Sequence, residues 1–178
     1  MKLHKILVMA TLLVVLLLAG CSSLDDAVVQ AKKVVPGDWQ VVHTQQVQSE
    51  ASIVFYINNS ELGAGLFKKD GFGWKWLGSG IGSLVTYPEG LSWRYAELGD
   101  KGTKVYLYYG FISNPGIEKV EVRTTWKEVA QAQIIEYGDE RIWYALISKS
   151  QVPSVDATIT GYGENGKILY LFDRPKES

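Results

Sequence analysis

The sequence is poor in the side chains that enzymes most often use for nucleophilic and acid–base chemistry. Its 178 residues include one cysteine, Cys21, and two histidines, His4 and His43. A single cysteine excludes a disulfide framework within the chain and a zinc site built from several thiolates. We therefore expect no metal site and no cofactor, and chemistry that uses almost no imidazole or thiol.

An excess of basic residues is also missing. The chain has 18 Lys and Arg against 19 Asp and Glu, and its formal net charge is −1. This balance argues against a dedicated nucleic-acid binder. A hydrophobic content of 47% with 12% aromatic residues excludes a disordered tail, and the length suits one domain that buries a sizeable core. We expect a folded domain with no nucleic-acid partner.

The apolar stretch at the N-terminus is too short for a typical membrane-spanning helix. Lys2, His4 and Lys5 form a positive start, and residues 6–20 carry no charge and are almost all apolar. A run of this length fits the hydrophobic region of a signal peptide and falls short of the ~20 residues that a spanning helix needs.

This run ends in Leu18-Ala19-Gly20-Cys21, followed by Ser22-Ser23. The motif closely resembles the lipobox of bacterial lipoprotein precursors. The resemblance implies that residues 1–20 are a lipoprotein signal peptide cleaved after Gly20. It also implies that Cys21 receives a diacylglycerol and that its new amino group can be acylated, for example with palmitate. Two acyl chains anchor a protein stably. The alternative is an uncleaved single-pass anchor with an unmodified Cys21.

The lipobox implies a location on the extracytoplasmic face of the cell membrane. In a Gram-positive cell this is the outer face of the cytoplasmic membrane. In a Gram-negative cell the outer membrane is expected, because Ser22 stands where an aspartate is associated with retention in the inner membrane.

Residues 21–37 are expected to hold the lipid anchor and a short helix over residues 24–35. Ser23 and Asp26 fit a capping box, and Pro36-Gly37 would end the helix. Leu24, Ala27, Val28, Ala31 and Val35 recur at helical spacing on one face. The alternative interpretation of this segment is a flexible tether.

Strand patterns dominate from Trp39 onward. Residues 38–80 are predicted to form a β-meander unit of three strands, with strands at residues 52–58, 62–68 and 74–77. A short Asn-Ser turn separates the first two strands. The glycine-rich residues 78–82 resemble a phosphate-binding loop only superficially, because a strand-like segment follows them, so we interpret them as a bend or bulge.

Residues 81–178 are predicted to form a β-sandwich-like unit that packs with residues 38–80 as one domain. Turn clusters rich in Gly, Asn, Asp and Pro separate most of its short strand candidates. These candidates are residues 83–87, 91–97, 103–111, 117–124, 131–137, 141–148, 155–162 and 167–172. The fold class is therefore mainly β, a short N-terminal helix followed by an antiparallel β meander and a sandwich-like sheet, with a minor α+β character.

Several segments also resemble uncharacterised secreted lipoproteins of spore-forming Gram-positive bacteria. They are residues 53–76, residues 109–115, the Arg-Ile-Trp-Tyr-Ala run at residues 141–145, and residues 161–167. This resemblance spans most of the mature chain. It implies no activity, so no functional residue is transferred from it.

Catalytic residues are not evident in the sequence. His43 could act as the base of a Ser-His-Asp triad, but the sequence contains no Gly-x-Ser-x-Gly motif to hold the nucleophilic serine. We therefore interpret His43 as a surface or half-buried strand residue. A glycosidase needs only two carboxylates, and Glu89, Glu97, Glu136 and Glu164 are candidates for such a pair. Most acidic residues, however, fall in turns or alternate outward on strands, as solvated charges do.

The aromatic residues are the most informative feature of the mature part. Trp74 and Trp76 share the parity of one strand, and Tyr106 and Tyr108 share the parity of another. Such rows can form a binding surface that stacks on sugar rings or on side chains of a partner. They can equally be the inner faces of sheets. We name these four residues as the candidate aromatic binding surface.

Together these patterns predict a lipid-anchored, extracytoplasmic protein of the cell envelope that binds and does not catalyse. Its partners would be the membrane, through the anchor, and an envelope polymer or envelope protein. An envelope glycan hydrolase that uses a carboxylate pair is the alternative. A module that regulates an enzyme or an assembly by covering its surface also fits the sequence.

Overall fold

The computed structural model describes residues 23–35, 37–71, 73–80, 85–86, 90–148 and 157–173. The lipobox and Pro36 lie outside these residues. The described elements are α2 (Leu24–Val34), β1 (Gln40–Gln48), β2 (Ala51–Asn58), β3 (Glu61–Asp70), β4 (Gly73–Gly80), β5 (Val85–Thr86), β6 (Ser92–Asp100), β7 (Thr103–Phe111), β8 (Lys119–Thr124), β9 (Val129–Gln131), β10 (Gln133–Tyr137), β11 (Glu140–Ile147), β12 (Ala157–Tyr162), the short 3-10 helix η1 (Glu164–Gly166) and β13 (Ile168–Phe172).

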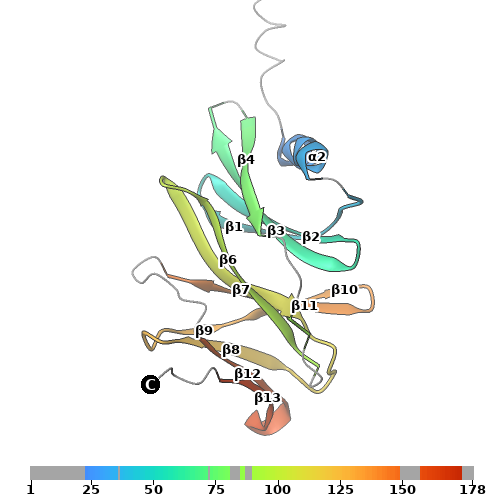
Figure 1. Ribbon diagram of the computed structural model, residues 1–178, viewed down its shortest axis with the longest axis vertical. Coiled ribbons are helices and arrows are strands. Elements are labelled where there is room, and N and C mark those ends of the chain that lie inside the picture. The colour runs from blue at the N-terminus through green and yellow to red at the C-terminus, as the bar shows by residue number, and fades with distance from the viewer. Residues whose placement is uncertain are drawn as a thin grey trace, which may run out of the picture.

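These strands form three antiparallel sheets within the described residues. The first sheet has the order β1-β2-β3-β4, the middle sheet β10-β11-β7-β6-β5 and the third sheet β13-β12-β8-β9. The prediction of a mainly β, sandwich-like fold with one short N-terminal helix is confirmed. The layers follow one another along the long axis, with α2 on the first sheet and the third sheet at the opposite end (Figure 1).

The predicted helix is confirmed, and its first turn has the predicted capping box. The Asp26 backbone N–H donates to Ser23 Oγ at 3.1 Å, and the Ser23 backbone N–H donates to Asp26 Oδ2 at 2.9 Å. Ala27, Val28 and Ala31 are buried against the first sheet, while Leu24 and Val35 pack at its margin. The amphipathic spacing therefore selects the buried face of α2 as expected.

The first sheet is a four-stranded meander, one strand longer than predicted. Asn59 and Ser60 both have positive φ, 51° and 68°, as a two-residue hairpin turn between β2 and β3 requires. The additional strand, β1, carries register shifts between Val41 and His43 and between Gln46 and Gln48. These bulges interrupt the alternation of apolar and polar residues by which a strand is recognised in sequence.

The predicted strand over residues 131–137 is divided between two sheets. Val129–Gln131 pairs with β8 in the third sheet, whereas Gln133–Tyr137 pairs with β11 in the middle sheet. At the crossing, the Ala132 backbone N–H donates to Val120 O at 2.9 Å. The chain therefore links the two sheets at Ala132.

The middle sheet is covered on both faces. On β7, Val105, Leu107 and Tyr109 belong to the core shared with the first sheet, whereas Tyr106 and Tyr108 belong to the core shared with the third sheet. A further cluster lies between α2 and the outer face of the first sheet and contains Trp39, Val54, Tyr56 and Phe67. The four layers thus enclose three successive cores.

Candidate functional site

Strand β4 places Trp74 and Trp76 on the face of the first sheet that α2 covers. In the antiparallel register Trp74 lies opposite Lys69 and Trp76 opposite Phe67. Both indoles are half-buried and pack at the edge of the cluster beneath α2. The predicted common orientation of the two tryptophans is therefore confirmed, because residues two apart on a strand point to the same face.

A β-bulge in β4 ends this row of aromatic side chains. Leu66 pairs with Gly78 while Phe67 pairs with Trp76, so Leu77 is the extra residue, and Gly78 has a φ of +134°. The bulge reverses the orientation of the residues that follow it, as an extra residue in one strand must. The interpretation of the glycine-rich residues 78–82 as a bend or bulge is confirmed at their start, where Gly78 follows the extra residue Leu77. The strand continues to Gly80, and residues 81–82 lie outside the described residues.

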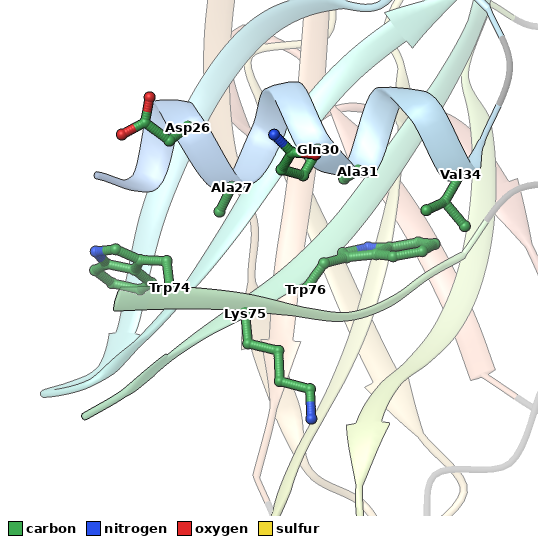
Figure 2. A pocket seen from close by; sticks show the side chains of 8 residues that line it. All are labelled: Asp26, Ala27, Gln30, Ala31, Val34, Trp74, Lys75 and Trp76. Atoms are coloured by element: carbon green, nitrogen blue, oxygen red, sulfur yellow. The ribbon is translucent and has the colours of Figure 1, made fainter. Parts of the chain in front are cut away.

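Small residues of α2 leave a hollow above the two indoles. Ala27 and Ala31, two small residues, lie on the side of α2 that faces β4, and Trp74 and Trp76 lie across from them on β4 (Figure 2). The resulting groove has a volume of about 340 Å³. We call it the α2–β4 groove, and it is lined by Asp26, Ala27, Gln30, Ala31, Val34, Trp74, Lys75 and Trp76.

The polar groups of the groove lie at its rim. Asp26 stands above Trp74 at one end and Val34 stands above Trp76 at the other, whereas Lys75 points away on the opposite face of β4 (Figure 2). The Asp26 carboxylate accepts hydrogen bonds from the Ser23 amide and hydroxyl. These bonds hold the pKa of Asp26 below its usual value, so its carboxylate is charged and already engaged.

The core cluster next to the groove, between α2 and the first sheet, contains a stacked aromatic pair. Trp39 stacks on Tyr56 with ring centroids 3.9 Å apart and planes 2° apart. Gly63 makes room for the Tyr56 ring, because a Cβ at that position would lie 2.4 Å from Tyr56 Cε2. Lys32 Nζ donates to Trp39 O at 2.8 Å and connects the last turn of α2 to this pair. This contact holds α2 against the first sheet beside the groove.

The buried indole nitrogens of Trp76 and Trp39 lack a hydrogen-bond partner among the described residues. Trp76 Nε1 is buried and lies 3.4 Å from where a Cβ on Gly65 would be. A buried donor without an acceptor is costly, and a bound water or ligand oxygen would relieve that cost. The lining as a whole offers apolar stacking surfaces with few hydrogen-bonding groups and no serine, cysteine or histidine.

Tyr106 and Tyr108 do not join Trp74 and Trp76, and their assignment to an exposed aromatic surface is wrong. Tyr106 is 9% exposed and Tyr108 is fully buried, both in the core between the middle and third sheets. The Tyr108 ring lies 5.2 Å from that of Tyr95 and 6.1 Å from that of Trp93. The two tyrosines do point to the same face of β7, as predicted, but the third sheet covers that face.

The other candidates of the sequence are dispersed over the fold. Glu97 pairs with Lys104, Glu136 Oε1 accepts from Arg141 Nε at 2.9 Å, and Glu164 is exposed in η1. His43 is half-buried as expected, with its ring centroid 5.8 Å from that of Tyr144. Cys21 and Glu89 lie outside the described residues.

Sequence reasoning missed the contribution of α2 to the site. Ala27, Ala31 and Gln30 are ordinary helix residues, and only their small size above two tryptophans creates the groove. The signal that could have suggested it is the Ala27/Ala31 pair, four residues apart on the apolar face.

The described residues contain no cluster of three or more His, Cys, Asp or Glu side chains that could hold a metal ion. Over the same ranges, no helix combines the length and the hydropathy needed to cross a bilayer. The chain matches no protein-family model, and neither a curated protein nor a solved structure is significantly similar to it. No activity is therefore transferred to it from a relative.

Proposed function

We propose that this protein is a lipid-anchored binding module on the extracytoplasmic face of the cell envelope, and that the α2–β4 groove binds a short segment of an envelope glycan. The observation that carries the proposal is the pair Trp74 and Trp76 along one side of an otherwise apolar groove. The lipobox motif at residues 18–21 supports the anchor and the location.

The chemistry of the lining favours a sugar over a flat apolar ligand. Indole faces stack on the C–H faces of sugar rings, while hydroxyl groups need nearby donors and acceptors. Gln30 at the rim supplies such a group. The volume of about 340 Å³ is at the lower end of the range for small-molecule sites, so the bound segment is short.

The lining also supports binding without catalysis. Asp26 is the carboxylate in the lining, and the capping box engages it. A glycosidase needs a second carboxyl group on the other side of the bond it cleaves. The lining offers the amide of Gln30 at its rim instead, because the Lys75 side chain points away from the groove.

The test is a titration of the full-length protein in detergent with a soluble chitooligosaccharide, followed by intrinsic tryptophan fluorescence, and co-sedimentation with purified peptidoglycan. We expect wild type to bind and Trp74→Ala or Trp76→Ala to weaken binding about tenfold. Gln30→Ala, at an exposed helix position, tests the rim without disturbing the core. Trp126→Ala is the matched control, since Trp126 is 61% exposed in the turn between β8 and β9.

Two results contradict the groove. The first is that wild type binds neither the chitooligosaccharide nor peptidoglycan. The second is that Trp126→Ala weakens binding as much as the groove variants do. The anchor has its own test, in which mass spectrometry of wild type should find an acylated Cys21 at the new N-terminus. Cys21→Ser should leave the membrane fraction or remain unprocessed, and unchanged membrane retention of this variant contradicts lipid anchoring.

A further inference from the structure

The proposed anchor lies next to the first turn of α2. Two peptide units separate Cys21 from Ser23, the N-cap residue of α2. An extended chain spans at most about 3.6 Å per residue, so the Cα atoms of these residues are within about 7 Å of each other. If Cys21 carries the lipid, as proposed above, the bilayer begins beside Ser23.

The same end of the molecule includes the turn between β3 and β4. Helix α2 and the tip of this hairpin lie together at one end of the long axis, opposite β12, η1 and β13 (Figure 1). Within the groove, Asp26 in the first turn of α2 stands over Trp74 near the start of β4 (Figure 2). Lys69 lies opposite Trp74 in the register and is exposed.

Three lysines give this end cationic groups that can meet lipid phosphates. Lys69 is exposed beside Trp74, Lys68 precedes it on β3, and Lys75 lies opposite Lys68 on β4. Carboxylates lie at the same end at Asp25, Asp26 and Asp70, and Glu50 and Asp100 lie close to the lysines. An anionic lipid surface attracts exposed lysines within a Debye length of about 8–10 Å.

We propose that the end formed by the first turn of α2 and the β3–β4 turn rests on the phospholipid headgroups, with the indole of Trp74 at headgroup level. Tryptophan favours this level because its ring is apolar and its N–H is polar. Lys69 beside it pairs with lipid phosphate groups. The lipid-anchored molecule then has one fixed orientation, and the groove opens at the bilayer surface.

The experiment uses the full-length protein reconstituted into vesicles of phosphatidylcholine and phosphatidylglycerol. Asp70→Cys and Glu164→Cys each place one thiol at an exposed position, at the hairpin tip and in η1. An environment-sensitive fluorophore on each thiol is quenched by a lipid-borne nitroxide and, separately, by aqueous iodide. We expect lipid-borne quenching to be several-fold stronger at position 70 than at position 164, with the reverse order for iodide.

Intrinsic tryptophan fluorescence gives a second readout in which Asp70 and Glu164 are not replaced. Brominated lipids should quench wild type more than Trp74→Phe, while Trp126→Phe, altered at the exposed turn between β8 and β9, should respond like wild type. Equal lipid-borne quenching at positions 70 and 164, or stronger quenching at 164, overturns the proposed orientation. So does a Trp74→Phe variant that is quenched as strongly as wild type.

The wild-type chain separates this inference from the proposal on which it rests. Its sole cysteine, Cys21, is a thioether if lipidated and does not take the fluorophore. Labelling of wild type together with loss from the vesicles contradicts the anchor itself. Unlabelled, vesicle-bound wild type with equal quenching at the two introduced positions contradicts the orientation alone.

Discussion

The indole of Trp39 lies flat on the phenol ring of Tyr56, 3.9 Å between centroids, beneath the helix that covers the first sheet. Both side chains are almost completely buried. The stack joins the segment that enters β1 to the centre of β2, and Lys32 adds a hydrogen bond from α2 to the Trp39 carbonyl. This contact therefore connects the helix, the segment that enters β1 and strand β2.

Trp39→Ala should lower the free energy of unfolding by about 3–5 kcal/mol, because it removes a buried indole and leaves a cavity under α2. Chemical denaturation measures this loss, and amide hydrogen exchange should show faster exchange over residues 24–34. Trp126→Ala, at an exposed turn, should change stability by no more than about 0.5 kcal/mol. Equal effects of the two substitutions would show that the stack contributes nothing specific.

Gly110→Ala should destabilise the middle sheet severely. A Cβ at position 110 would lie 2.0 Å from the backbone oxygen of Ser92, so β6 and β7 would have to separate. We expect a loss of more than about 3 kcal/mol in thermal or chemical unfolding. Gly102→Ala is the matched control, since the nearest atom to its Cβ is 3.6 Å away, and it should be neutral or slightly stabilising. A Gly110→Ala protein as stable as this control would contradict the close approach of β6 and β7.

Removal of the capping box should loosen α2. Ser23→Ala deletes the side chain that accepts from the Asp26 amide, which costs about 1 kcal/mol at a helix N-cap. The circular dichroism of the helix and its exchange protection should both fall. A variant with unchanged protection over residues 24–34 would show that packing on the first sheet alone holds the helix.

The contribution of Asp26 should depend on pH. The hydrogen bonds from Ser23 lower the pKa of the Asp26 carboxyl in the folded protein. The stabilising effect of Asp26 is therefore present above the unfolded pKa of about 3.9, and it is lost as the pH falls through the folded pKa. Wild type should be more stable than Asp26→Asn near neutral pH, and the difference should shrink below about pH 4. Denaturation of both proteins across this range measures the difference, and a constant gap contradicts the argument.

Tyr95 should make the fold sensitive to alkali. Burial, followed by the charges of Glu97 and Tyr106, raises its pKa to about 12. Because the folded pKa is raised, this stabilising contribution is complete below the unfolded pKa of about 10 and is lost as the pH rises towards 12. Denaturation curves should show that wild type loses more stability than Tyr95→Phe between pH 10 and 12. Phenolate absorbance should show that Tyr95 ionises only near the upper end of this range. Equal losses of stability in the two proteins would contradict a raised pKa of Tyr95.

The sequence predicted those features that depend on neighbouring residues. The capping box of Ser23 and Asp26, the turn at Asn59 and Ser60, and the strand over residues 103–111 all follow from local patterns and match the structure. Strand β1 was not counted in the meander because its two bulges break the alternation of its side chains. Residues close in the sequence therefore predict a helix, turn or strand well where its side chains follow one regular pattern.

What could not be predicted depends on which layer covers which face. Period-two alternation correctly grouped Tyr106 with Tyr108 and Trp74 with Trp76, but it does not say which face another sheet will bury. Ala132 illustrates the same limit, since one residue decides that β9 and β10 belong to different sheets. The groove itself arises from small residues of α2 placed over β4, a contact between segments about 45 residues apart.

Strand β7 is the shared wall of two cores, and this has a mechanical consequence. Leu107 and Tyr108 are neighbours on the chain and are fully buried on opposite faces. A displacement of the β7 backbone disturbs the packing of both cores at once, so neither core can unfold while the other stays intact. The stack of sheets should therefore unfold in a single cooperative transition, and damage at either end of the molecule is transmitted to the whole.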